Sequence, residues 1–172
     1  MVRRLLPLVL LVFLAVPLPG AAAADSQADN PQGRSERVKK GVGHFERAFY
    51  GLIPHKRDAE ASREFDLAIA EFEAELRAKP TSLESHRYLA RIFTARKQHR
   101  EAARHYDDIT NLDPADIDTL VLAASAWAEA GERDEARERL LLAKGRTSDP
   151  HALLLLDQYL AKLDRDLPVP VK

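Results

Sequence analysis

The sequence contains no cysteine, and its charges nearly cancel, with 26 basic and 27 acidic residues in 172. The absence of cysteine excludes disulfides, thiol catalysis, cysteine-based metal sites and a lipid-modified cysteine after a leader. The near-zero net charge argues against a dedicated nucleic-acid-binding protein, because such proteins concentrate positive charge. Outside its first residues the chain also lacks long apolar runs.

Motifs that carry catalysis are absent as well. The sequence has no H-E-x-x-H, no G-x-S-x-G and no glycine-rich phosphate loop, and Gly41 and Gly43 stand too close together to form one. These two glycines instead favour the close approach of another helix. We therefore expect no enzymatic activity and no cofactor.

Two groupings of acidic and histidine residues have side chains that can bind metals. Glu101 and His105 are four residues apart on a predicted helix, so both side chains could face one ion, but no third ligand lies within sequence reach. Asp113, Asp116 and Asp118 form a second grouping, but the loop lacks the glycine and the distal glutamate of a calcium site. Helix capping accounts for Asp113 and Asp116 without a metal. We predict no metal site.

The one long apolar run, Leu5–Val16, follows Arg3-Arg4 and ends at Pro17-Leu18-Pro19-Gly20 before an alanine-rich stretch. This order is typical of a secretory signal peptide, residues 1–24, cut after Ala24. The alternative is a membrane anchor, but the run is short compared with the roughly 20 residues of a membrane span. We predict a periplasmic or secreted protein, without stable membrane insertion after cleavage; the periplasm is favoured, and a eukaryotic secretory route stays open.

Small, aromatic and proline residues recur with a period of 34. The positions in phase are Ala68, Ala102 and Ala136; Phe72, Tyr106 and Leu140; and Pro80 and Pro114. Within one period, apolar residues follow helical spacings, as in the stripes Leu89, Ala90, Phe93 and Ala102, Tyr106, Ile109. A fixed period of this length predicts stacked helical hairpins.

Residues 83–116 resemble a tetratricopeptide repeat (TPR), with Leu89-Ala90 at the Leu-Gly pair of the family and Phe93 at its tyrosine. The unit departs at His86, where the family often has tryptophan, and at Ile109, where a small residue is usual. The next unit matches at Ala124, Trp127, Gly131, Ala136, Leu140 and Ala143. The resemblance implies an all-α fold: a right-handed α-solenoid of helical hairpins with a C-terminal capping helix, in which Trp127 packs in the core.

The predicted order of the chain is a flexible leader (25–34), a TPR domain (35–165) and a tail (166–172). The domain divides into a degenerate repeat at about 35–80, repeats 83–116 and 117–150, and a capping helix over 150–164. In the first helix one apolar stripe is expected: Val38, Val42, Phe45, Phe49 and Leu52. Thr81 and Glu84 are spaced as a capping box, and Pro114 suits the first turn of a helix.

The resemblance also implies a binding face, because the first helix of each TPR hairpin lines the concave side. By position, this groove consists of Glu84, Arg87, Arg91 and Thr94 from one repeat and Asp118, Val121, Ser125 and Ala128 from the next. Arg87 and Arg91 are neighbours on a helix, so their two guanidiniums could grip a carboxylate or an acidic peptide stretch. The favoured interpretation is that they pair with Glu84 and Asp118 and stay solvated.

Two further features bear on that face. The lysine and asparagine of the family's carboxylate-clamp variant are missing, so its specificity is not assigned. A second basic group lies around the turn between the two helices of the middle repeat and consists of Arg96, Lys97, Arg100 and Arg104. We expect these side chains to form a solvated rim; alternatively, they contact an anionic surface.

The favoured function is a non-enzymatic adaptor that binds a protein or peptide segment in its concave groove, in the assembly of a cell-envelope complex by family analogy. The alternative is a structural subunit of a permanent envelope complex, docked through helix edges that include Leu154 and Leu155. A third reading is an enzyme or metal carrier. Nucleic acid is not expected as a partner.

Overall fold

The computed structural model describes residues 33–165, and this part of the chain is helical without a β-strand. The predicted signal peptide, most of the predicted leader and the predicted tail lie outside the described residues. The helices in chain order are α1 (Glu36–Glu46), the π-helix η2 (Arg47–Leu52), the 3₁₀-helix η3 (Ile53–His55), α2 (Asp58–Ala78), α3 (Leu83–Ala95), α4 (His99–Leu112), α5 (Ile117–Glu129), α6 (Arg133–Arg146) and α7 (Pro150–Arg165).

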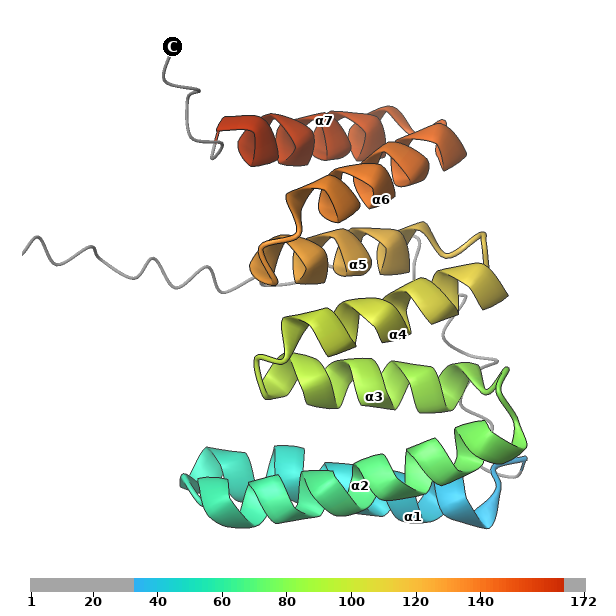
Figure 1. Cartoon of the computed structure of the whole chain (residues 1–172), viewed down its shortest axis with the longest axis vertical. Coiled ribbons are helices and arrows are strands. Elements are labelled where there is room, and N and C mark those ends of the chain that lie inside the picture. The colour runs from blue at the N-terminus through green and yellow to red at the C-terminus, as the bar shows by residue number, and fades with distance from the viewer. Residues whose placement is uncertain (1–32, 166–172) are drawn as a thin grey trace, which may run out of the picture. The chain divides into compact units, whose positions relative to one another are not determined.

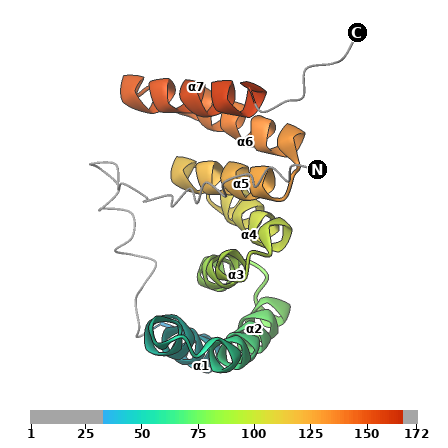
Figure 2. The same ribbon diagram turned by 90° about the vertical axis from the view of Figure 1, so that its left-hand side faces the viewer.

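Each helix packs mainly on its neighbours in the chain, so the helices form a stack of hairpins (Figures 1 and 2). The helix α1 with η2 pairs with α2, α3 pairs with α4, α5 pairs with α6, and α7 lies on α6. This arrangement confirms the predicted all-α solenoid.

The core follows the 34-residue period. Ala68, Ala102 and Ala136 are buried, and so is Phe72. Ala90 of α3 and Ala102 of α4 belong to the same core cluster, and both are fully buried, so the small side chains let the two helices approach closely. The alanines therefore lie at helix crossings, as the period predicts.

Two predicted helix ends are wrong by a few residues. The residue that caps α3 is Ser82 rather than Thr81, because the Ser82 hydroxyl accepts a hydrogen bond from the Ser85 amide. Pro114 lies in the turn before α5 rather than in its first turn. The carboxylate of Asp116 caps α5 by accepting from the Thr119 amide at 2.9 Å.

The apolar stripe of the first helix changes course at Phe49. The α-helical spacing predicts Phe49 on the buried face, but its side chain is exposed, while Ala48 and Leu52 are buried. The buried positions Phe45, Ala48 and Leu52 are three and four residues apart, and Phe49 lies one position beyond this stripe, on the π-helix η2. Apolar spacing alone allows either Ala48 or Phe49 on the buried face, and the smaller alanine takes it.

The predicted solvated rim is also partly wrong. The Arg96 guanidinium donates to the Ser62 carbonyl and to the Asp66 carboxylate, so it joins α3 to α2. Arg100 forms an ion pair with Glu132, which joins α4 to the start of α6. Only part of this basic group is therefore open to solvent.

Over residues 33–165, every helix is too short or too polar to cross a bilayer.

Candidate functional site

The eight residues predicted to line the groove lie on two helices. Those from α3 and those from α5 repeat the same spacing of three, four and three, so each set follows one helix face. All eight are exposed or half-buried. Their surroundings differ, however, and they leave only part of the face open.

Glu84 and Arg87 are already paired within the chain. The Glu84 carboxylate lies 2.6 Å from Nε of Arg34, the last residue of the predicted leader. Arg87 Nη2 lies 3.7 Å from the carboxylate of Asp116, the cap of α5. Arg87 therefore pairs with a carboxylate of the chain itself, as the interpretation of internal pairing expects. Its partner is Asp116, however, and not Glu84 or Asp118.

Arg91 differs from Arg87. Its side chain is exposed, and its guanidinium carbon lies 6.0 Å from the centre of the Tyr88 ring, one turn earlier. Among residues 33–165, no carboxylate forms an ion pair with Arg91. This arginine is the charged group of α3 that remains available to a ligand.

The remaining predicted residues contribute shape more than charge. The Thr94 hydroxyl donates to the Ala90 carbonyl at 2.8 Å, so it is satisfied within α3. On α5, Val121 and Ala128 pack against the core, whereas Asp118 is exposed. Ser125 lies half-buried between them.

An aromatic cluster joins α3 to the π-helix through the core. The buried Phe45 lies at its centre: its ring centre lies 5.3 Å from that of Phe49 and 5.1 Å from that of Tyr88. Tyr50 meets Phe49 edge-on at 5.2 Å and is 67% exposed. We call Phe49, Tyr50, Tyr88 and Arg91 the aromatic–basic surface. The aromatic half of this surface was not predicted, because the apolar spacing of the first helix places Phe49 in the core and the sequence pattern assigns no role to Tyr50.

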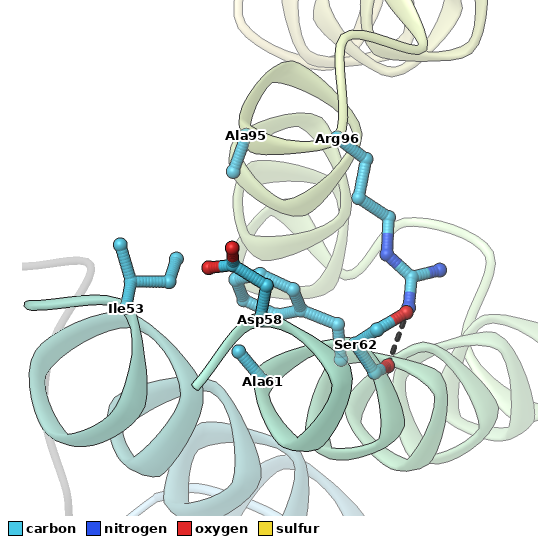
Figure 3. A pocket seen from close by; sticks show the side chains of 7 residues that line it. Ile53, Asp58, Ala61, Ser62, Ala95 and Arg96 are labelled. Carbon is cyan, nitrogen blue, oxygen red and sulfur yellow. Dashed lines mark hydrogen bonds between the residues drawn. The ribbon is translucent and has the colours of Figure 1, made fainter. Parts of the chain in front are cut away.

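A shallow hollow of about 210 Å³ lies beside η3, where α2 begins and α3 ends (Figure 3). Its lining residues are Ile53, Asp58, Ala61, Ser62, Phe65, Ala95 and Arg96. Figure 3 shows Arg96 reaching across to Ser62, and the Arg96 guanidinium also lies 5.7 Å from the Phe65 ring centre. Because its arginine is tied to the opposite wall, the hollow is a packing feature at the hairpin junction.

A polar cluster lies between α3 and α4. His86 Nδ1 lies 3.1 Å from His105 Nδ1, and both are near the Asp108 carboxylate. Burial, and then the charge of His86, lower the pKa of His105 to about 4, so its ring is neutral at neutral pH. The sequence offered two signals for this cluster: the departure from the repeat pattern at His86, and the spacing of His105 and Asp108 by three on one helix.

No family model and no curated protein matches this sequence. The structure is similar to that of the N-terminal domain of stress-induced protein-1 (STI-1) from C. elegans, with a TM-score of 0.51 and 10% sequence identity. The match covers 76% of this chain and 99% of that domain. At this identity the likeness concerns the fold alone, and it supports the TPR-like arrangement of helices.

Proposed function

We propose that the protein is a non-enzymatic adaptor that binds a segment of another protein on its aromatic–basic surface. The observation that supports this function is the exposed Arg91, whose guanidinium lies 6.0 Å from the half-buried Tyr88 ring at a position where the repeat pattern places a ligand-binding face, together with the exposed Phe49 and Tyr50 on η2. Exposed aromatic residues next to an arginine are the composition that protein interfaces favour.

The chemistry of the surface indicates the kind of segment. Phe49 and Tyr50 offer apolar area at one end, and Arg91 offers a charge-assisted hydrogen bond at the other. A segment with an apolar or aromatic side chain close to a carboxylate satisfies both ends. Because Arg87 is held by Asp116, a single arginine contributes most of the electrostatic attraction.

We further propose that this binding takes place in the cell envelope or outside the cell. The support is the signal-peptide pattern of residues 1–24, with the expected cut after Ala24. The intact mass of the native protein tests this part separately, because a chain that keeps residues 1–24 in a membrane fraction contradicts it.

The alternative is a structural subunit, and exposed leucines near the carboxyl end favour it. Leu141 and Leu142 on α6 and Leu154 and Leu155 on α7 are all exposed. Exposed apolar side chains gathered in one patch mark interaction sites, and these leucines come in adjacent pairs on two helices that pack together. In this case the chain docks in a permanent complex through α6 and α7.

Site-specific photo-crosslinking distinguishes the two functions. A photoreactive residue is placed at Tyr50, which is 67% exposed, or at Leu154, which is 60% exposed. Native envelopes are irradiated, and adducts are identified by mass spectrometry. Adducts from Tyr50 that a short peptide of the partner abolishes support the adaptor, whereas adducts from Leu154 at fixed stoichiometry support the structural subunit.

The adaptor makes a quantitative prediction at Arg91. Arg91→Glu should weaken binding of the captured partner at least 10-fold, about 1.4 kcal/mol, with helicity and melting temperature nearly unchanged. The loss should shrink at high salt, because salt already screens the wild-type contact. Arg104→Glu is the matched control, since Arg104 is an exposed arginine of α4. If Arg104→Glu releases the partner and Arg91→Glu retains it, the aromatic–basic surface is not the working surface.

A further inference from the structure

Three side chains with metal-ligating atoms meet between the two helices of the middle hairpin. His86 comes from α3, and His105 and Asp108 come from one face of α4. The two Nδ1 atoms are 3.1 Å apart, and the nearer Asp108 oxygen lies 3.4 Å from His86 Nδ1 and 3.9 Å from His105 Nδ1. All three ligand atoms fall within 4.8 Å of one another.

A backbone carbonyl fixes the tautomer of His86. Its Nε2 lies 3.1 Å from the Pro80 carbonyl oxygen, which accepts only, so Nε2 carries the hydrogen and donates it. In the neutral ring this leaves the Nδ1 lone pair directed at His105 and Asp108. Histidines that bind metals commonly hold their second nitrogen in this way, by donating it to a backbone carbonyl.

The spacing of the three atoms suits one tetrahedral ion. Zinc binds imidazole nitrogen and carboxylate oxygen at about 2.0–2.2 Å, so two ligands of a tetrahedral ion stand about 3.3–3.5 Å apart. The three distances between the ligand atoms, 3.1, 3.4 and 3.9 Å, lie slightly below, within and slightly above this range. Small side-chain rotations bring all three atoms to it.

The surroundings hold the ligands in place and leave one side open. The His105 ring stacks on Phe93, with ring centres 5.5 Å apart and planes 2° from parallel. The His86 side chain is 9% exposed, whereas that of Asp108 is 50% exposed. The cluster is therefore ordered from within the hairpin and reachable from solvent at Asp108.

We propose that His86, His105 and Asp108 form a binding site for one divalent transition-metal ion, with Zn²⁺ as the best match to two imidazoles and a carboxylate. The fourth position faces solvent and is filled by water or by a side chain of a bound protein. The ion joins α3 to α4 directly, because it takes ligands from both helices. This site is separate from the aromatic–basic surface and does not depend on the proposed adaptor function.

The site is tested by titrating Zn²⁺ into the full chain without a histidine tag, with heat of binding as the readout. Co²⁺ serves as the spectroscopic probe, since a tetrahedral Co²⁺ site absorbs strongly in the visible range. We expect one ion per chain and a rise in melting temperature of several degrees at saturating Zn²⁺. Asp108→Asn, at a half-exposed position, and His105→Ala should each weaken binding at least ~10-fold.

His151→Ala is the matched control, because His151 is an exposed histidine at the start of α7 that lies outside the cluster. It should leave affinity and the Co²⁺ spectrum unchanged. His86→Trp restores the residue that the repeat pattern favours, and it should abolish binding while the chain stays helical. The proposal is overturned if the wild type gives no tetrahedral Co²⁺ spectrum, if Asp108→Asn and His105→Ala bind Zn²⁺ as tightly as the wild type, or if His151→Ala weakens binding as much as they do.

Discussion

One glycine sets the closest approach between the first two helices. A Cβ atom added to Gly41 on α1 would lie 2.8 Å from two ring carbons of Phe72 on α2, closer than real contacts allow. Phe72 is fully buried and stacks on Tyr88 at 5.0 Å, so its ring has no room to move away. A Cβ atom added to Gly43, two residues later, would have no other atom within 4 Å.

The two glycines should therefore respond to alanine in opposite directions. Gly41→Ala overpacks the crossing and should lower the free energy of unfolding by about 1–3 kcal/mol. Gly43→Ala adds helix propensity at an open position and should raise it by about 0.5–1 kcal/mol. Urea unfolding followed by circular dichroism measures both. Equal shifts of the same sign would mean that α1 and α2 do not cross at Gly41.

The sequence predicts a close approach at these glycines but not which one makes it. Two glycines separated by one residue point in different directions on a helix, and the choice depends on how α1 is rotated against α2. The same limit explains Phe49, which is exposed while its neighbour Ala48 is buried, because apolar spacing does not tell which of two adjacent positions faces the partner helix.

At the scale of helices, the carboxylate of Asp107 connects three elements. From α4 it accepts a hydrogen bond from Trp127 Nε1 on α5 at 3.0 Å and two from Arg139 on α6, at 2.8 and 3.0 Å. The hydrogen bond with Asp107 raises the pKa of Arg139 above its ordinary value. Trp127 lies in the core as its repeat position predicts, and its one polar atom is satisfied by this contact.

Removal of this carboxylate should cost more than removal of an exposed one. Asp107→Ala leaves the Trp127 N–H and the Arg139 guanidinium without their partner, which should lower the free energy of unfolding by about 1–3 kcal/mol. Glu138 is the control, because it pairs with the same arginine at 2.8 Å from an exposed position. Glu138→Ala should change stability by less than about 0.5 kcal/mol. Chemical denaturation followed by Trp127 fluorescence compares them, and equal losses would contradict the proposed link.

The elements themselves were largely predictable, whereas the polar contacts between them were not. Repeated alanines and aromatics mark helix crossings because burial acts on every repeat alike. Asp107 and Arg139 are 32 positions apart and polar, so the sequence alone assigns both to a solvated face. The contact between His86 and His105 was not predictable for a related reason. The two residues lie on different helices, and only the packing of the hairpin brings their rings together.

At the scale of the whole molecule, the described helices form a chain of local interfaces. Three arginines form hydrogen bonds between successive hairpins: Arg96 with the Asp66 carboxylate, Arg139 with the Asp107 carboxylate, and Arg146 with the Pro114 carbonyl. In such a stack, stability is approximately a sum over repeats and their neighbours. An end of the stack then needs a cover, because its last hairpin has no neighbour to bury its apolar face.

The helix α7 provides this cover at the carboxyl end, and Leu156 is its buried contact. Leu156 is 2% exposed and packs in one cluster with Leu120, Ala124, Leu140 and Ala143. The two leucines just before it on the same helix, Leu154 and Leu155, are exposed. A single helix therefore offers a buried position and a matched exposed one.

Leu156→Ala should lower stability by about 2–5 kcal/mol through the lost contacts and the cavity, and the loss should be local. Amide hydrogen exchange should quicken in α5, α6 and α7 and stay slow in α1 and α2, because few interactions connect the two ends of a stack. Leu154→Ala should change neither the exchange rates nor the melting temperature appreciably. If Leu156→Ala instead speeds exchange equally in every helix, the hairpins unfold as one cooperative unit, and the sum of neighbouring interfaces does not describe this protein.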